Sequence, residues 1–127
     1  MKEIFTIHPR RQKVLYQCEH CKTNYKRRQR AMDCEAEPVE DIVFKVGDRV
    51  TWTEKRGCTH AYGQDYCIDG LVVAVCGLQL PDEEYNNKWF GGRLAGKHVH
   101  MYQVNWECPY CLLKYSRRFY SLELKKL

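Results

Sequence analysis

The chain has 127 residues, of which 44% are hydrophobic, and a formal net charge of +5 at pH 7. This length suits one domain of ordinary size or two very small ones, and the hydrophobic fraction favours a globular protein with a core. The totals exclude a membrane-spanning class, because no segment is long and apolar enough to cross a bilayer. The first residues, MKEIFTIHPRRQKV, lack the apolar stretch of a signal peptide, so we expect an intracellular, cytoplasmic protein.

Eight cysteines are many for a chain of this length. In a reducing compartment, cysteines grouped as close pairs are more often metal ligands than disulfides. The composition therefore favours zinc before any motif is considered.

The positive charge is unevenly distributed along the chain. Eight Lys or Arg stand against one acid between His8 and Arg30, whereas six acids stand against one lysine between Ala31 and Asp48. The tail from Leu112 onward is basic again. Two basic segments that meet in space would attract phosphate groups or an acidic protein surface, and the alternative is that both are simply solvated faces.

The first motif is YQCEHCKTNYKRR, from Tyr16 to Arg28, which follows the β-favouring run Val14-Leu15-Tyr16. We predict a β-hairpin whose turn is the Cys-x-x-Cys segment, with backbone N–H groups directed toward the sulfurs. Residues 25–37 (YKRRQRAMDCEAE) predict one or two helical turns. The acidic stretch DCEAEPVED then forms a linker.

Three strands are predicted in the middle of the chain. Residues 42–52 place Phe44, Val46, Val50 and Trp52 on one strand face, with a bend permitted at Gly47-Asp48. Residues 70–76 form a short apolar run that suits a central strand. A last strand, residues 100–106, precedes a second cysteine pair. The patterns F-x-V-G-D-x-V-x-W, G-x-V-x-x-V and V-x-W resemble the SH3-like small barrels, which include Tudor and KOW domains, and this resemblance implies a small β-barrel over residues 38–100.

Two long connections interrupt these strands. Residues 53–69 contain Cys58, His60 and Cys67, which could hold a second metal with Cys34 or Cys76, but their spacing matches no standard knuckle and favours loop residues. Residues 81–97 contain the predicted partner-binding residues Trp89, Phe90 and Arg93 in a recognition loop. The alternative is that the two aromatic side chains of this loop fold back onto the barrel.

The segment Gly91 to Lys97 fits the G-x-x-x-x-G-K pattern of a phosphate-binding loop, but His98 replaces the Ser or Thr that would ligate magnesium. A strand follows it where a helix is required, so we reject a nucleotide site. His98 and His100 share one face of the predicted strand, and we interpret them as structural.

The second motif, NWECPYCLLKYSRR from Asn105 to Arg118, repeats the first as Cys-x-x-Cys-x-x-x-Tyr-x-Arg-Arg. Two such knuckles supply the four sulfurs of a tetrahedral site, so we predict one structural zinc ion held by Cys18, Cys21, Cys108 and Cys111. The paired motifs resemble the zinc-ribbon family, although Lys22 and Leu112 stand where its knuckles usually have glycine. The resemblance implies a discontinuous ribbon module, residues 1–37 and 101–127, and a mainly β protein.

The sequence CPYC also matches the glutaredoxin active site. Only sixteen residues follow Cys111, however, and they cannot build a thioredoxin-like domain. No catalytic motif stands out elsewhere, so we predict no enzyme.

We therefore expect a non-enzymatic zinc-binding module that binds RNA or DNA. Closure of a single zinc site would bring two Tyr/Arg-rich segments together, so that phosphates meet the cations and bases stack on the tyrosines. The predicted nucleic-acid-binding residues are Tyr25, Lys26, Arg27, Arg28, Arg30, Lys114, Tyr115, Arg117 and Arg118. The alternatives are a protein-interaction adaptor or inhibitor, acting on a transcription, translation or defence complex, and then a dithiol oxidoreductase.

Overall fold

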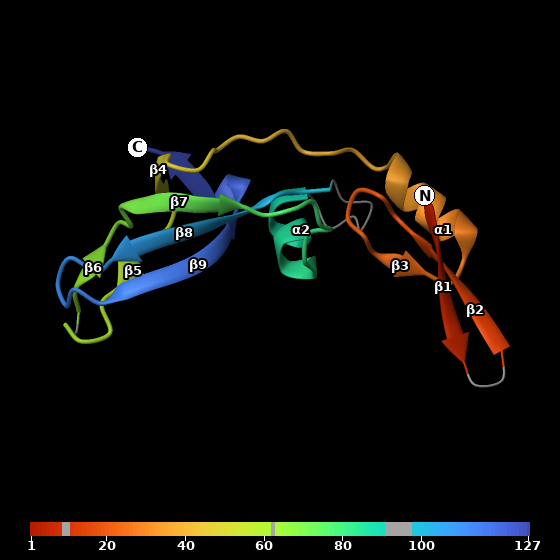
Figure 1. The fold of residues 1–127 in the computed structure, drawn as a ribbon. Coiled ribbons are helices and arrows are strands. Elements are labelled where there is room, and N and C mark those ends of the chain that lie inside the picture. The colour runs from red at the N-terminus through yellow and green to blue at the C-terminus, as the bar shows by residue number, and fades with distance from the viewer. Residues whose placement is uncertain (9–10, 62, 91–97) are drawn as a thin grey trace. The chain divides into compact units, whose positions relative to one another are not determined.

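The computed structural model describes residues 1–8, 11–61, 63–90 and 98–127 and divides the chain into two compact units (Figure 1). Unit 1 comprises Met1–Glu40 and Leu78–Val99, and unit 2 comprises Asp41–Gly77 and His100–Leu127. Strands dominate the described part of the chain, so the prediction of a mainly β protein is confirmed. Neither of its two α-helices is long and apolar enough to cross a membrane.

This division differs from the predicted one. Residues 101–127 were predicted to form one module with residues 1–37, whereas in the structure they belong to the same unit as residues 41–77. The physical reason is sheet pairing, because the strand that enters the second cysteine pair is hydrogen-bonded along its length to the central strand of unit 2.

Unit 1 contains a three-stranded antiparallel sheet of order β1-β2-β3, formed by Lys2–His8, Arg11–Gln17 and Asn24–Tyr25. Helix α1 (Arg28–Ala36) follows and buries Ala31 and Cys34 on one face, as the spacing of three residues requires. It ends shortly before Pro38, which disfavours the helical conformation in the preceding residue. The predicted helical turns within residues 25–37 are confirmed.

Helix α2 (Glu83–Phe90) replaces part of the loop that the sequence analysis expected over residues 81–97. Its start is stabilised by Asp82, whose Oδ1 accepts a hydrogen bond of 2.7 Å from the Tyr85 amide. Glu83 and Glu84 in the first turn also favour the helix, because acidic side chains stabilise the positive end of its dipole. Residues 91–97, including Arg93 and the segment that resembles a phosphate-binding loop, lie outside the described residues.

Unit 2 is built on a five-stranded antiparallel sheet of order β10-β4-β7-β8-β9. In chain order, these strands are β4 (Arg49–Trp52), β7 (Gly70–Val75), β8 (Met101–Glu107), β9 (Lys114–Tyr120) and β10 (Leu124–Lys126). A short 3-10 turn, η1 (Ser121–Glu123), precedes β10, and the connection after β4 carries a two-stranded ladder of β5 (Arg56–Gly57) and β6 (Asp65–Tyr66). The last strand of unit 2, β10, pairs antiparallel with its first strand, β4.

The predicted central strand over residues 70–76 is confirmed as β7, which lies between β4 and β8. The predicted strand over residues 42–52 is wrong in its first part, because only residues 49–52 are a strand. Gly47 has a φ of 97°, and the Asp48 carboxylate accepts a hydrogen bond from the Lys45 amide, so a tight turn interrupts the extended chain. Val46 is consequently 61% exposed.

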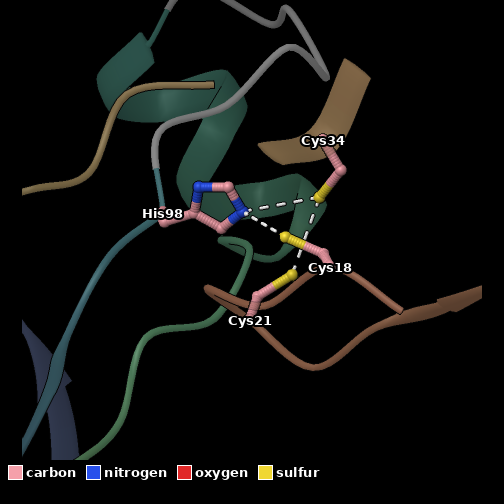
Figure 2. A group of neighbouring side chains, drawn as sticks. All are labelled: Cys18, Cys21, Cys34 and His98. Carbon is pink, nitrogen blue, oxygen red and sulfur yellow. Dashed lines mark hydrogen bonds between the residues drawn. The ribbon is translucent and has the colours of Figure 1, made fainter. Parts of the chain in front are cut away.

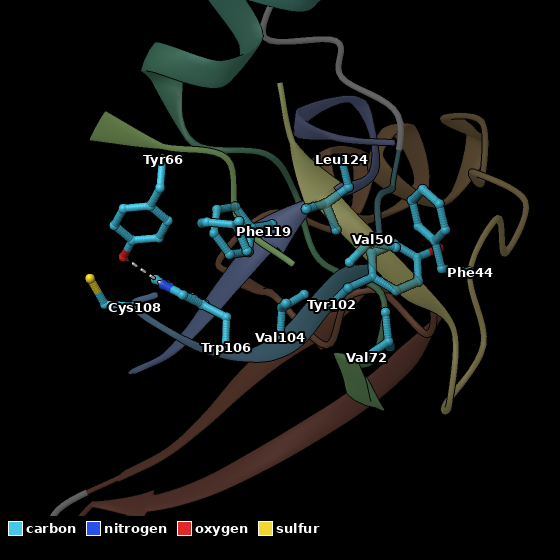
Figure 3. Close-up of a cluster of buried hydrophobic side chains, with 11 residues drawn as sticks. Phe44, Val50, Tyr66, Val72, Tyr102, Val104, Trp106, Cys108, Phe119 and Leu124 are labelled. Atoms are coloured by element: carbon cyan, nitrogen blue, oxygen red, sulfur yellow. Dashed lines mark hydrogen bonds between the residues drawn. The ribbon is translucent and has the colours of Figure 1, made fainter. Parts of the chain in front are cut away.

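The core of unit 2 covers one face of this sheet (Figure 3). Strand β8 alternates between buried and exposed positions, and its buried side chains Tyr102, Val104 and Trp106 pack with Phe119 of β9. The Trp106 indole N–H donates a hydrogen bond of 3.1 Å to the Tyr66 hydroxyl. Cys108 belongs to the same buried cluster, so the second cysteine pair is anchored directly on the core.

Candidate metal centres

Both Cys-x-x-Cys segments form the same hairpin turn. In each, the amide of the residue after the second cysteine donates to the carbonyl of the first cysteine, at 2.9 Å. The amide of the first cysteine donates to the carbonyl two residues after the second cysteine, at 3.0 Å in the first hairpin and 2.9 Å in the second. The strands that flank each turn are paired antiparallel, so the two predicted hairpins are confirmed.

The position that follows the second cysteine is left-handed in both turns. Lys22 has a φ of 61° and Leu112 a φ of 63°. This is the position where knuckles usually have glycine, because a side chain on Cβ is strained in this conformation. Both turns therefore have the knuckle geometry, although Lys22 and Leu112 and not glycine occupy the left-handed position.

Replacing Leu112 by glycine should relieve this strain and stabilise unit 2 by roughly 0.5–1 kcal/mol, after the higher entropy of glycine in the unfolded chain is subtracted. Leu112 is 65% exposed, so little packing is lost. The measurement is urea unfolding of the metal-loaded protein. Leu113→Gly is the matched control, since Leu113 is half exposed without a positive φ, and it should destabilise the unit. Equal losses in both variants would contradict the argument.

Centre 1, which we define as Cys18, Cys21, Cys34 and His98, brings together three sulfurs and one imidazole in unit 1 (Figure 2). The Nε2 atom of His98 lies 3.4 Å from the Sγ atoms of both Cys18 and Cys34, and the Sγ atoms of Cys21 and Cys34 are 3.6 Å apart. Tetrahedral zinc with bonds of about 2.3 Å to sulfur and about 2.0 Å to nitrogen places neighbouring ligand atoms roughly 3.5–3.8 Å apart. The four side chains could therefore hold a metal ion.

Separate elements position these four ligands. The first knuckle supplies Cys18 and Cys21, and helix α1 supplies Cys34 from its buried face. The helix is tied to the knuckle by a hydrogen bond of 3.1 Å from the Glu19 amide to the Glu35 carboxylate. His98 is held by its backbone, because its amide donates to the Pro38 carbonyl at 2.6 Å and its carbonyl accepts from the Glu40 amide at 2.8 Å.

Burial governs the charge of centre 1. Cys18 and His98 are 0% exposed. Burial raises the pKa of Cys34 to about 12, so this thiol is protonated at neutral pH until a cation replaces the proton. Burial also opposes ionisation of Cys21, but hydrogen bonds from Thr23 outweigh it and lower the pKa of this thiol. Metal binding would therefore release protons, as expected for thiolate ligands.

Centre 2, which we define as Cys58, Cys108 and Cys111, brings together three sulfurs in unit 2, all within 4.8 Å of one another. Cys108 and Cys111 come from the second knuckle, and Cys58 directly follows β5. Burial opposes ionisation of Cys108, but the amides of Cys111 and Tyr110 donate to its sulfur and lower its pKa to about 7. These contacts agree with the predicted direction of N–H groups toward sulfur in the second knuckle.

The structure corrects the predicted grouping of the ligands. One ion was predicted between Cys18, Cys21, Cys108 and Cys111, whereas in the structure the two pairs belong to two clusters, one in each unit, that could each hold a metal ion. The physical reason is that each knuckle finds further ligands within its own unit. Cys34 and His98 were missed as ligands of the first knuckle, and Cys58 was considered only for a separate loop site with His60 and Cys67, both of which are exposed.

The predicted nucleic-acid-binding residues are likewise divided between the units. Lys26, Arg27, Arg28 and Arg30 are exposed at the start of α1, and Lys114, Arg117 and Arg118 are exposed on β9. The Tyr25 hydroxyl is held near the sulfurs of centre 1, and its pKa is raised by burial and by its hydrogen bond to Cys34.

In unit 2, the aromatic and arginine side chains pack on one another. The Tyr115 ring stacks on Trp106, with ring centroids 5.5 Å apart. The Arg117 guanidinium lies 5.3 Å from the Trp52 ring centroid and 5.0 Å from that of Phe119. Arg117 and Tyr115 therefore have structural contacts, which leaves Lys114 and Arg118 as the more open cations of this strand.

The predicted partner-binding residues are described only in part. Trp89 is 36% exposed on α2, and its ring centroid lies 6.3 Å from that of Tyr85. Phe90 is the last residue of this helix. Arg93 lies outside the described residues.

Comparisons of the chain with protein-family models, with curated proteins and with solved structures found no match.

Proposed function

We propose that the protein is a non-enzymatic binding module in which each knuckle helps to hold its own structural zinc ion. The observation that carries this proposal is the spacing of the ligand atoms in centre 1, which matches a tetrahedral zinc site. Thiolates with an imidazole favour zinc over the hard cations magnesium and calcium, which prefer oxygen. In centre 2, the third sulfur of Cys58 beside the CPYC pair supports metal binding over a dithiol redox function.

We also propose that unit 2 is an SH3-like small barrel. The pairing of its last strand, β10, with its first strand, β4, supports this proposal, since a sheet must return on itself to enclose a core. The core lies on one face of that sheet and ends at Cys108. The resemblance to zinc ribbons is then limited to the geometry of each single knuckle, because the two knuckles belong to different units.

Nucleic acid is the partner that we propose for this module. Four exposed cations, Lys26, Arg27, Arg28 and Arg30, follow the first knuckle directly. No acid occupies the first turn of α1, although acids there would stabilise the helix and cations do not. Such a cluster gains nothing for the fold, and it suits contacts with phosphate groups.

The test replaces Arg27, Arg28 and Arg30 together by glutamate. Acidic residues at a helix start are favourable, so unit 1 should remain folded and keep its zinc. Affinity for a short single-stranded RNA or DNA should fall by on the order of 100-fold, because three phosphate contacts become repulsive. Titration from about 50 to about 200 mM salt should also show a slope in log affinity that is smaller by about 2.

The matched control makes the same change of charge elsewhere, with Lys45, Lys55 and Lys125 replaced by glutamate. These three lysines are exposed in unit 2 and were not part of the predicted surface. The control variant should lose much less affinity for the nucleic acid. Titration of the wild-type protein with RNA and with DNA shows which of the two is preferred. Equal losses in both triple variants would show that only net charge matters and would reject the surface at α1.

A protein-interaction adaptor is the second candidate, supported by the partly exposed Trp89 on α2. Aromatic residues of this kind are enriched at interfaces. A partner that remains bound after nuclease treatment and is lost with Trp89→Ala would favour this function over nucleic-acid binding.

A further inference from the structure

Centre 2 has three sulfurs, whereas structural zinc takes four ligands in a tetrahedron. We propose that His60 is its fourth ligand, so that centre 2, like centre 1, has three cysteines and one histidine. This inference rests on the proposed zinc-binding function. Two features of unit 2 support His60 as this ligand. Strand geometry excludes the other candidate ligands of unit 2, and the turn after Cys58 contains His60.

Strand alternation excludes Cys67. Arg56 and Tyr66 are opposite each other in the β5–β6 ladder and share one face, which carries the buried Tyr66 ring and its contact with Trp106. Cys58 lies two residues after Arg56 and continues on this face. Cys67 lies next to Tyr66, points to the opposite face and is exposed.

Strand length excludes Cys76. Its amide donates to the Met101 carbonyl, at the start of β8, whereas Cys108 follows the other end of that strand. The seven residues of β8 separate the two ends by roughly 20 Å at about 3.3 Å per residue. His100 is at the same remote end, where its Nδ1 atom lies 2.9 Å from the Cys76 carbonyl oxygen.

The turn that follows Cys58 wraps around its sulfur and contains His60. The Ala61 amide donates to Cys58 Sγ at 3.2 Å, and the Cys58 amide donates to the Gln64 carbonyl at 2.8 Å. This N–H to sulfur bond is the kind of contact that the second knuckle makes to Cys108. Thr59 also contacts the neighbouring strand, with its Oγ1 atom 3.5 Å from the Tyr115 hydroxyl, so the turn is held beside the second knuckle.

His60 is close to Cys58 in the chain. Two peptide units place its Cα at most about 7 Å from that of Cys58. Its side chain is exposed and lies outside the group of three sulfurs, so it must rotate toward them to complete the set. A turn that presents Cys58 and His60 two residues apart would then complete the set formed with Cys108 and Cys111.

The test titrates the apoprotein with Co²⁺, whose absorption reports the number of thiolate ligands and the tetrahedral geometry. Two Co²⁺ ions should bind wild-type protein. In His60→Ala, the ion in centre 1 should be unchanged, and the affinity of the ion in centre 2 should fall by at least about 100-fold. Loss of a residue that merely supports a ligand already costs about 10- to 100-fold, and loss of a ligand should cost more.

Cys67→Ser is the matched control and should bind both Co²⁺ ions as the wild type does. A His60→Ala protein with two ions of unchanged affinity and unchanged spectrum would overturn the assignment of His60, as would a loss of the second ion in Cys67→Ser. If wild-type protein bound no Co²⁺ at all, the proposed zinc-binding function itself would fail, so the two failures are distinguishable.

Discussion

Replacing Cys34 by serine is expected to remove one of two zinc ions and to unfold unit 1. Cys34 is buried on α1, and its sulfur lies near both Cys21 and His98. Structural zinc contributes roughly 10–16 kcal/mol of apparent binding free energy, which is comparable to or larger than the typical stability of a small domain, about 5–15 kcal/mol. Loss of one ligand should therefore leave unit 1 without enough free energy to remain folded.

Two readouts would separate this local effect from global unfolding. Elemental analysis should give one zinc per chain, and NMR should show the indole N–H signal of Trp89 in unit 1 shifted to its unfolded position. The indole signals of Trp52 and Trp106 should persist, because both lie in unit 2. Cys67→Ser, at an exposed cysteine outside both clusters, is the control. A Cys34→Ser protein that retained both ions would contradict the assignment of centre 1.

Replacing Trp106 by alanine is expected to destabilise unit 2 by about 3–5 kcal/mol, the usual loss for a buried tryptophan. Trp106 is 5% exposed and packs against Tyr115 and Phe119. Its indole is also the donor to the buried Tyr66 hydroxyl, so the variant leaves that hydroxyl without its partner. The measurement is urea unfolding of the zinc-loaded protein.

Leu122→Ala is the control within the same unit. Leu122 is 43% exposed on η1, so its truncation should cost less than about 1 kcal/mol. Trp106→Phe should fall between the two variants, because it keeps most of the packing and removes the hydrogen bond. Equal losses in Trp106→Ala and Leu122→Ala would contradict the position given to Trp106 in the core.

The sequence was sufficient to predict the parts of the centres that depend on short-range pattern. Each Cys-x-x-Cys segment follows a β-favouring run, so both hairpins could be predicted. The repeat also predicted that both turns are knuckles of the same kind. Lys22 and Leu112 stand in place of the usual glycine and counted against that geometry, yet both residues are left-handed.

The partners of each pair could not be predicted, because they depend on long-range contacts. Four thiols in two matched pairs can supply all four ligands of one tetrahedral site. The same two pairs can also supply two ligands to each of two sites, if other residues supply the remaining ligands. Cys34 was interpreted as part of a linker, and as a ligand only of an alternative site with Cys58, although it lies three residues after Ala31 on the face that α1 buries. His98 was interpreted as structural, since no local pattern places its imidazole beside Cys18, which is 80 residues away in the sequence.

The same distinction holds for the fold. The central strand β7 is a continuous apolar run, and its position between two other strands followed from that pattern. The assignment of residues 101–127 to unit 2 depends on pairing between β7 and β8, which the resemblance to a ribbon obscured. Helix α2 had a local signal in Asp82 followed by two glutamates, and this signal was overlooked beside the glycines that follow the helix.

The two knuckles are proposed to belong to two metal centres and not to one. The measurement that tests this proposal most directly is the zinc-to-chain ratio of the purified protein, determined by elemental analysis. The two-centre arrangement predicts two zinc ions per chain. A ratio of one that is lost both in Cys18→Ser and in Cys108→Ser would contradict it and would restore a single ion shared by the two pairs.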